Sequence, residues 1–353
     1  MEILTKVIVE QIDRAINEKR SFAIAILPGS LIIQWFEAGE CTTYLPDGTV
    51  TTSNDISFDI SPWLQPFAER WTLGDGIPQW DTMYPCKKSM TYEDYINAVA
   101  QIIEICRLRN GKTVFSRTIC GKTPCDGDNY SWGQTANRFF TRFHDAFRYI
   151  CYSAKTGGWM GATPELLLEY NKITGQFHTV AIAGTRKKNN SGILEWDEKN
   201  IRENRFVSEY IQNVLSAIGI KVTVSPLRNV TYGYIEHLCA DIYGIASPDK
   251  LSDIIDAINP TPALCGFPKN EALADLAIYE PHKRYLYGGF IGIDSVDRYR
   301  AYVNLRCIHF HHNDYCIYGG GGIVAESSPE TEYEETVAKT SPLIDLLIQH
   351  DAS

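Results

Sequence analysis

Residues 146–186 have the sequence AFRYICYSAKTGGWMGATPELLLEYNKITGQFHTVAIAGTR, and this segment decides the fold class. Runs of apolar, aromatic and β-branched residues alternate in it with short glycine-rich turns, a pattern typical of consecutive β-strands. We therefore predict three strands over this segment. The same signals predict further strands at residues 22–27, 112–117, 288–294, 299–310 and 313–318.

Helical segments lie between these strands. Apolar residues at helical spacing predict helices at residues 4–18, 92–109, 195–218, 251–258 and about 331–348. Thr91 can cap the second of these helices. No fixed-period repeat and no linker-like tract divides the chain. We predict a fold of the α/β class (α+β type), one large domain over residues 1–353 with two mixed or antiparallel β-sheets packed together and helices outside.

The composition narrows the classes of function. The chain has 353 residues, of which 44% are hydrophobic and 22% charged, values that are ordinary for a globular protein. A formal net charge of -10 argues against a nucleic-acid partner, because phosphates require a basic surface. The charge does not exclude a small anionic substrate, since a local cluster of Arg and Lys can outweigh the global sign.

The cysteines and the apolar segments indicate a cytoplasmic protein with no membrane association. The ten cysteines include no CxxC pair, and several lie in apolar runs, so we predict reduced, buried thiols rather than disulfides or zinc sites. The amino terminus has no long apolar stretch behind a basic start, so no signal peptide is expected. The most apolar segment, residues 22–36, is too short and is interrupted by Pro28 and Gly29.

A glycine run near the end of the chain is the first candidate for chemistry. Residues 318–324 have the sequence YGGGGIV, which follows a predicted strand. Bare backbone N–H groups there could bind an anion, and a flexible turn or bulge is an equal alternative. Glu332, Glu335 and Lys339 follow at helical spacing. Such residues are usually surface ion pairs, but carboxylates beside an anion site would also suit Mg²⁺.

Two further segments carry charged residues whose role the pattern leaves open. Residues 199–204, KNIREN, lie within a predicted helix and would by default form its solvated face. Residues 161–168, GATPELLL, place Glu165 directly before an apolar strand. That carboxyl could close a turn, or it could project into a cleft as a general acid.

Taken together and in order, these segments resemble the chorismate-binding enzymes. That family includes isochorismate synthases, salicylate synthases, and the large subunits of anthranilate and aminodeoxychorismate synthases. The resemblance rests on residues 112–117, 161–165, 181–186, 199–204, 236–238, 259–266, 305–306 and 319–339. It is dense from Lys112 to Lys339. We therefore treat residues 101–350 as the catalytic part and residues 1–100 as a less recognisable N-terminal part.

The resemblance implies a Mg²⁺ site made of carboxylates. Glu203 and Glu335 match the family's metal ligands, and Glu332 matches an outer carboxylate. Relatives usually carry an acidic residue where this chain has Asn200, and His where it has Asn204, so the surroundings of the metal are expected to differ here.

The resemblance also implies a set of substrate contacts for chorismate. Arg306, Lys339 and the backbone of Gly320 and Gly322 would hold its carboxylates. The walls around the ring would be formed by Ala263, Leu264, Tyr287 and Leu305. Polar contacts would come from His237 and Thr185, and Gly184 would be a further contact.

The residue types at a few positions distinguish the reactions that members of the family catalyse. In members that add water at C2, a Lys that matches Lys112 activates the water, and a Glu that matches Glu165 protonates the departing 4-hydroxyl. The first role requires an uncharged amine. Anthranilate synthases usually carry Gln at the Lys112 position, and aminodeoxychorismate synthases usually carry a nucleophilic Lys where this chain has Ala183. Both differences favour water as the nucleophile.

The expected activity is therefore that of an isochorismate synthase with Mg²⁺ as cofactor, acting as a monomer or homodimer without a glutaminase partner. The product would enter menaquinone, siderophore or salicylate biosynthesis. Salicylate synthase, which goes on to eliminate pyruvate, is the nearest alternative. An ammonia-adding synthase component and a non-catalytic chorismate-binding protein are the other two.

Overall fold

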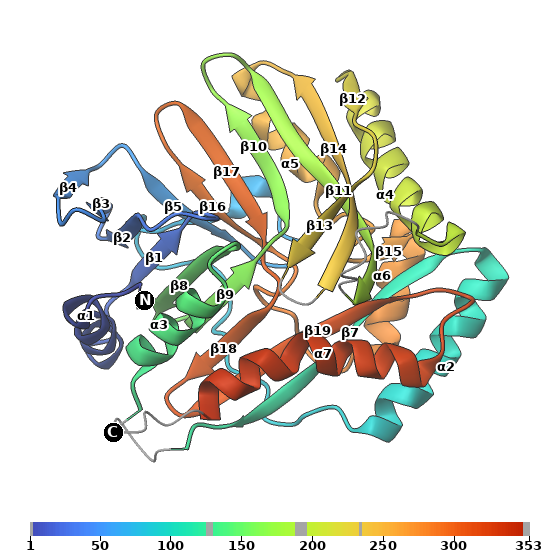
Figure 1. Ribbon diagram of the computed structural model, residues 1–353, viewed down its shortest axis with the longest axis horizontal. Helices are drawn as coiled ribbons and strands as arrows, with labels where there is room; N and C mark the ends of the chain where they lie inside the picture. Colours follow the sequence, from blue (N-terminus) through green and yellow to red (C-terminus); the bar gives the residue numbers. More distant parts are fainter. Residues whose placement is uncertain (1–2, 125–129, 188–195, 233–234, 349–353) are drawn as a thin grey trace.

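Two antiparallel β-sheets dominate the structure, a computed structural model that describes residues 3–124, 130–187, 196–232 and 235–348 (Figure 1). In the first sheet, the described residues form ten strands in the order β15 (Gly266–Phe267), β7 (Lys112–Lys122), β19 (Asp314–Ile323), β18 (Cys307–His311), β9 (Gly157–Thr163), β8 (Phe147–Ser153), β1 (Phe22–Ile26), β2 (Ile33–Glu37), β3 (Glu40–Tyr44) and β4 (Val50–Ser53). In the second, they form nine: β12 (Val222–Val224), β14 (Ile235–Ile245), β11 (Gln176–Lys187), β10 (Leu166–Asn171), β17 (Arg298–Val303), β16 (Phe290–Asp294), β5 (Ser57–Ser61) and β6 (Trp71–Thr72), with β13 (Arg228–Tyr232) also paired to β14. The predicted fold class is confirmed.

The segment 146–186 holds four strands, so the prediction of three is wrong. The chain leaves β9 at Thr163 and enters β10 at Leu166, and this step takes it from the first sheet to the second. Pro164 stands at the crossing, where its missing N–H costs no ladder hydrogen bond.

A second crossing lies beside the first. The single strand predicted over 299–310 is two strands in different sheets, β17 and β18, because the chain turns at Arg306 with a φ of 47°. The backbone N–H of Val303 donates to the carbonyl of Glu165 at 2.9 Å. The two crossings therefore place Glu165 and Arg306 together at the seam between the sheets.

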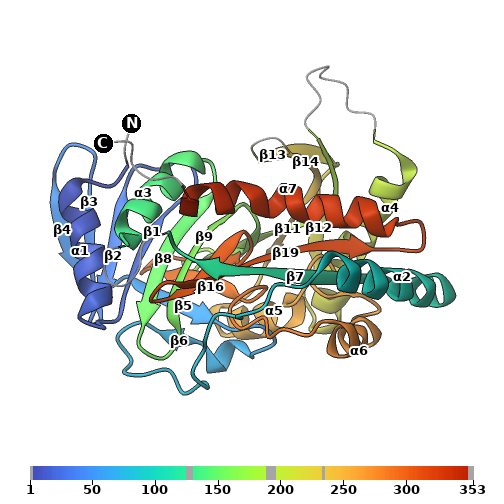
Figure 2. The same ribbon diagram turned by 90° about the horizontal axis from the view of Figure 1, so that it is seen from below.

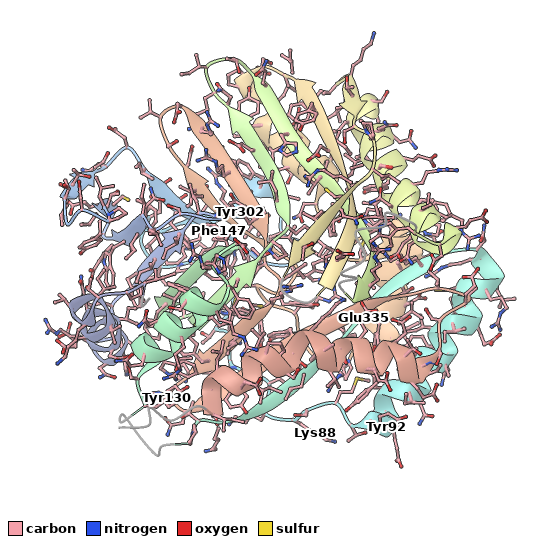
Figure 3. All side chains as sticks on the ribbon, in the orientation of Figure 1. Lys88, Tyr92, Tyr130, Phe147, Tyr302 and Glu335 are labelled. Atoms are coloured by element: carbon pink, nitrogen blue, oxygen red, sulfur yellow. The ribbon has the colours of Figure 1, made fainter. Side chains whose placement is uncertain are left out.

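Aromatic side chains fill the space between the sheets. Phe147 of β8 stacks on Tyr302 of β17 with ring centroids 4.2 Å apart (Figure 3). Tyr149 reaches across to donate its hydroxyl to Asn304 Oδ1 at 2.6 Å. Burial of rings of this size contributes most of the favourable free energy of such a core, and each buried hydroxyl needs a partner. The contacts fix the two sheets against one another.

Helices cover the outer faces of both sheets (Figure 2). The first sheet is covered by α1 (Lys6–Asn17), α3 (Trp132–Arg142) and α7 (Pro329–Ile348). The second sheet is covered by α4 (Glu198–Ala217) and α5 (Leu251–Ile258), with the short 3-10 turns η1 (Phe67–Glu69) and η3 (Pro248–Lys250) beside them. The helices α2 (Tyr92–Arg109) and α6 (Lys269–Tyr279) pack against β7.

The five predicted helices are confirmed, with small shifts at their ends. Helix α2 has the predicted bounds, and its first turn is capped as expected, because the Thr91 hydroxyl accepts from the N–H of Asp94 at 3.1 Å. Helices α3 and α6 were not predicted. In α3, Gly133 obscures the helical pattern, and a Cβ there would lie 2.3 Å from the carbonyl oxygen of Val9.

The glycine run is part of a strand and not the loop that the sequence suggests. Strand β19 continues through all four glycines to Ile323, paired with β7 from Gly319 opposite Arg117 to Gly322 opposite Val114. Side chains from α7 and β7 occupy the space that a Cβ would need. A Cβ at Gly322 would lie 2.4 Å from Lys112 Cε. The glycines therefore allow charged groups to approach the strand closely.

The first hundred residues contribute to both sheets: β1 to β4 extend the first, and β5 and β6 the second. The division into an N-terminal and a catalytic part stays a prediction. Among the described helices, none combines the length and the apolar character that crossing a bilayer requires.

Candidate active site

A cavity of about 310 Å³ opens at the seam between the sheets, bordered by β19, β11, β14, α4 and α7. It collects the candidate residues that were predicted at distant points of the sequence. Those lining it are Lys112, Glu165, Gly184, Glu203, His237, Ala263, Leu264, Tyr287, Leu305, Arg306, Gly320, Gly322, Glu332, Glu335 and Lys339. Thr185 lies on β11, but its side chain falls outside the described part of the chain.

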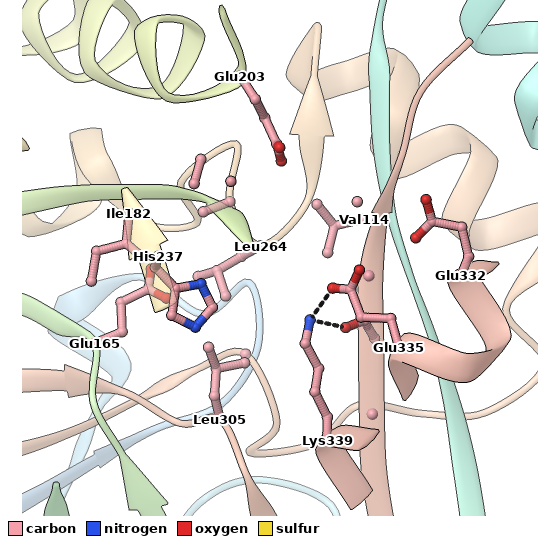
Figure 4. A pocket seen from close by; sticks show the side chains of 18 of the residues that line it. Val114, Glu165, Ile182, Glu203, His237, Leu264, Leu305, Glu332, Glu335 and Lys339 are labelled. Carbon is pink, nitrogen blue, oxygen red and sulfur yellow. Dashed lines mark hydrogen bonds and ion pairs between the residues drawn. The ribbon is translucent and has the colours of Figure 1, made fainter. Parts of the chain in front are cut away.

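Two lysines and two glutamates form ion pairs beside the glycine strand. Lys112 Nζ of β7 contacts Glu203 Oε1 of α4 at 2.5 Å. Lys339 Nζ contacts Glu335 Oε1 at 2.7 Å, one turn away on α7 (Figure 4). These charged side chains are largely shielded from solvent, which strengthens their interaction relative to a surface pair. The cavity thus holds alternating positive and negative groups.

The backbone of the glycine strand turns its polar groups toward the cavity at alternate positions. The carbonyl of Gly320 accepts a hydrogen bond from Lys339 Nζ at 2.8 Å and so points away from β7. Ser116, its partner on β7, donates its N–H to Glu280 rather than across the ladder. In a strand, the N–H and C=O of one residue point to the same side. The N–H groups of Gly320 and Gly322 are therefore directed toward the cavity, as an anion site requires.

The carboxylates offer the ligand chemistry of a magnesium ion. A Cβ built on Gly321 would lie 3.0 Å from Glu332 Oε2 and 3.7 Å from Glu335 Oε1, and one on Gly322 would lie 3.3 Å from Glu203 Oε1. Glu332 and Glu335 therefore border Gly321, and Glu203 borders its neighbour Gly322. Among the described residues, no group of three or more acidic, His or Cys side chains could hold a metal ion by itself. Mg²⁺ is usually held by one or two carboxylates together with water and substrate oxygens, so the residues fit.

Glu165 lies on the other side of the cavity, next to His237 (Figure 4). Only 8% of Glu165 is exposed. Burial raises the pKa of its carboxyl to about 7, and the charges of Lys112 and Lys339 oppose that shift only in part. A carboxyl with this pKa is partly protonated at neutral pH and can donate a proton, as a general acid must.

The raised pKa of Glu165 predicts a pH-dependent cost in stability. Folding favours the protonated carboxyl, so its contribution to stability is complete below about pH 4.5 and is lost as the pH rises through about 7. Replacing Glu165 by Gln removes that loss. We expect Glu165→Gln to raise the free energy of unfolding at pH 8 by up to roughly 3 kcal/mol, and to change it little at pH 4, in urea titrations.

Glu169→Gln is the matched control, because Glu169 lies on β10, the strand that follows Glu165, and has neighbouring cations that lower its pKa. Burial raises the pKa of Glu169, but Arg298 and Arg300 outweigh this effect and leave it lowered. Its removal should therefore destabilise the protein at pH 8. Equal effects of Glu165→Gln at both pH values would contradict the burial argument.

Burial and the nearby cations keep the ring of His237 neutral. Burial, followed by the nearby cations Arg306 and Lys339, lowers the pKa of His237 to about 3. The effect on Glu335 is opposite: burial raises its pKa, but the charge and hydrogen bond of Lys339, together with Lys112, outweigh this and leave it below its ordinary value. His237 can therefore serve as a neutral hydrogen-bonding group, while Glu335 remains ionised and able to bind a cation.

Two buried residues that support the site had no assigned role in the sequence. Asn204, one residue after Glu203, donates its amide to the carbonyls of Ala181 at 2.9 Å and Leu238 at 3.0 Å. It thereby ties α4 to the two strands that border the cavity. Arg284 donates to the carbonyls of Leu264 and Val114 at 2.9 and 2.8 Å. A single sequence could not reveal these contacts, because each partner is a backbone carbonyl.

Asn200 also has a different role from the acidic residue of relatives. Its side-chain amide donates to Asp197 Oδ1 at 2.8 Å, and Asp197 caps the first turn of α4. A Cβ on Gly184, whose φ is +82°, would lie 3.0 Å from Asn200 Oδ1. Asn200 therefore helps to pack the start of α4 against β11 at the edge of the cavity.

Comparison with known proteins gives the family. The model of the family described as chorismate binding enzyme matches residues 77–348. The chain belongs to this family. The match includes every residue that lines the cavity and extends over all of α2, which begins before the predicted catalytic part.

The relatives of this chorismate-binding enzyme include isochorismate synthases and anthranilate synthase components. Isochorismate synthase EntC of Escherichia coli is 29% identical over 250 residues, which cover 68% of this chain and 63% of EntC. Anthranilate synthase component 1 of Acetivibrio thermocellus is 32% identical over 208 residues, 55% of this chain and 42% of that protein. The chain thus spans less than two thirds of these relatives.

A solved structure with the same fold is that of MenF, the menaquinone-specific isochorismate synthase from Escherichia coli. It superposes with a TM-score of 0.68 at 18% identity and covers 97% of this chain and 99% of that one. At this identity the likeness shows the fold, which supports the two-sheet architecture described above.

Proposed function

We propose that this protein is an isochorismate synthase, which converts chorismate to isochorismate by adding water at C2 and releasing the 4-hydroxyl. The observation that carries the proposal is the pairing of Lys112 and Glu165. Both are only 8% exposed and line one cavity, and Glu165 has a pKa of about 7. A buried amine and a proton-donating carboxyl are the two groups that the displacement needs.

Each of these residues has a proposed role in the reaction. Lys112 would take a proton from the attacking water, and Glu165 would give one to the oxygen that leaves C4. Arg306, Lys339 and the outward N–H groups of the glycine strand would hold the substrate carboxylates. Glu203 and Glu335 would hold Mg²⁺, which when bound supplies positive charge against the ring carboxylate.

The substrate fits the size and charge of the site. The cavity of about 310 Å³ lies at the lower end of the range for small-molecule sites. Leu264, Leu305 and Tyr287 give it an apolar wall for the ring, opposite the charged groups. A compact dianion with an apolar ring matches this division.

The direct test is to incubate the purified protein with chorismate and Mg²⁺ and to separate the products by chromatography. We expect isochorismate. Fluorescent salicylate together with pyruvate would instead assign the protein as a salicylate synthase. An aromatic amine formed when ammonium salts are added would assign it to the ammonia-adding members, and chorismate binding without any turnover would reject the enzymatic proposal.

Glu335→Gln should weaken Mg²⁺ binding and activity together. The substitution removes one of the two negative charges proposed to hold the ion while keeping the shape of the side chain. We expect the apparent dissociation constant for Mg²⁺, measured by calorimetry in the presence of chorismate, to rise by at least about tenfold. Glu334→Gln is the matched control, because the neighbouring Glu334 is exposed on the same helix. An unchanged Mg²⁺ titration in Glu335→Gln would contradict ligation by this residue.

A further inference from the structure

Three cysteines gather near the end of β7 and β19 that lies away from the glycine run. Cys120 of β7 is directly opposite Cys316 of β19, and their sulfur atoms are 3.5 Å apart. Cys86, in the segment before α2, adds a hydrogen bond to the Cys120 thiol. All three are unoxidised. None of them takes part in the proposed reaction.

The backbone already has the geometry of a disulfide between Cys120 and Cys316. Residues directly opposite in an antiparallel pair have Cα atoms about 4.5–5.5 Å apart, and disulfides span about 4.4–6.8 Å. The two sulfur atoms need to approach from 3.5 Å, which rotation of the side chains can provide. No strand has to shift.

Access and ionisation differ between the two partners. Cys120 is partly exposed, whereas Cys316 is completely buried. The hydrogen bond shared with Cys316 and further bonds from Thr118, Cys86 and Ser89 outweigh burial and lower the pKa of Cys120 to about 7. The same shared bond and burial raise the pKa of Cys316. Cys120 is therefore the thiol that ionises, and thiolates are the form that reacts with oxidants.

We propose that Cys120 and Cys316 form an oxidisable thiol pair that hydrogen peroxide converts to a disulfide. The Cys120 thiolate attacks one peroxide oxygen, the O–O bond breaks, and hydroxide leaves to give a sulfenic acid. The Cys316 sulfur then attacks the Cys120 sulfur, the S–O bond breaks, and water leaves. Two thiols lose two electrons and two protons, and one peroxide becomes two water molecules.

The pair adjoins the aromatic wall of the cavity. Tyr318, two residues after Cys316 and on the same face of β19, stacks on Tyr287 with ring centroids 5.0 Å apart. Both rings line the cavity. The modification site is therefore in contact with the layer that borders the substrate, although the inference does not depend on the proposed reaction.

To test this, the reduced protein is treated with a small molar excess of hydrogen peroxide, and its remaining free thiols are blocked. It is then digested with trypsin without reduction. Cleavage after Arg117, Lys122, Arg306 and Lys339 leaves Cys120 and Cys316 on peptides 118–122 and 307–339. We expect these peptides to be linked, with a mass two hydrogen atoms below their sum, and dithiothreitol to release them.

Cysteine-to-serine variants identify which two cysteines form the disulfide. Cys86→Ser and Cys307→Ser should keep the link, and Cys307 is the necessary control because it shares the second peptide. Cys120→Ser should abolish the link. A link in wild type between residues 118–122 and the peptide that holds Cys86, or oxidation of Cys120 to sulfinic acid without any link, would overturn the proposal. Fragmentation of the linked wild-type peptides in the mass spectrometer tells Cys316 from Cys307 as the partner, so a variant that fails to fold does not obscure the result.

Discussion

Replacing Lys112 by Ala is expected to lower kcat by roughly 10²–10⁴-fold, the usual cost of losing a general base. Binding of chorismate should change little, because the anchors assigned to its carboxylates lie on Arg306, Lys339 and the glycine strand. The variant should bind Mg²⁺ at least as tightly as wild type. The reason is that the Lys112 amine contacts Glu203 at 2.5 Å, and a cation held by Glu203 would have to displace this contact. Initial rates and separate titrations of chorismate and Mg²⁺ check each part.

Lys122→Ala is the matched control for this experiment. Lys122 ends the same strand β7, but its side chain is 77% exposed and pairs with Asp314 at the surface. Its removal should leave the rate unchanged. Turnover retained by Lys112→Ala would refute its role as the base. A variant that loses Mg²⁺ binding along with activity would assign Lys112 a role in building the metal site instead.

Replacing Glu165 by Gln is expected to slow the chemical step by roughly 10²–10⁴-fold while the affinity for chorismate is nearly kept. Gln preserves the size and hydrogen-bonding reach of the side chain but has no proton to give to the departing hydroxyl. In wild type, kcat/KM should fall as the pH rises above about 7, because the carboxyl loses its proton there. The residual activity of the variant should lack this decline.

Glu169→Gln again supplies the comparison, since Glu169 lies on the strand that Glu165 precedes and pairs with Arg298 and Arg300 away from the cavity. It should keep the wild-type rate and pH profile. If Glu165→Gln kept its rate, or kept the alkaline decline, the proton would have to come from another group.

The sequence predicts the local elements of this fold well where one signal dominates. Helix α2 is fixed by its apolar stripe and its Thr91 cap, and both bounds agree with the structure. Strand β7 begins at Lys112 as predicted, after the turn at Asn110, whose φ is positive. Such features depend on residues that are close in the sequence, so a single sequence is enough to predict them.

The errors occur where tertiary contacts decide. Periodicity does not show that the chain changes sheets at Pro164 and again at Arg306, because each crossing takes only two or three residues between similar apolar runs. The glycine run has no side chains to show periodicity, and its pairing with β7 makes it a strand. The close approach of Lys112 and Glu332 explains why glycine stands at these positions.

The candidate site was predicted through resemblance, since Lys112, Glu203 and Glu335 are far apart in the chain and each has an ordinary surface explanation taken alone. The folded chain brings these three residues to one cavity, but the residues next to each of them in the sequence give no sign of it. Asn204 shows the limit: its contacts with two backbone carbonyls hold α4 in place, and no residue pattern encodes them.

The most direct test of the proposed water addition at C2 is a reaction with chorismate and Mg²⁺ in water labelled with oxygen-18. The product is then analysed by mass spectrometry. We expect isochorismate that carries one solvent oxygen at C2, formed roughly 10²–10⁴-fold more slowly when Lys112 is replaced by Ala. Isochorismate without the label, or an aromatic product in its place, would contradict it.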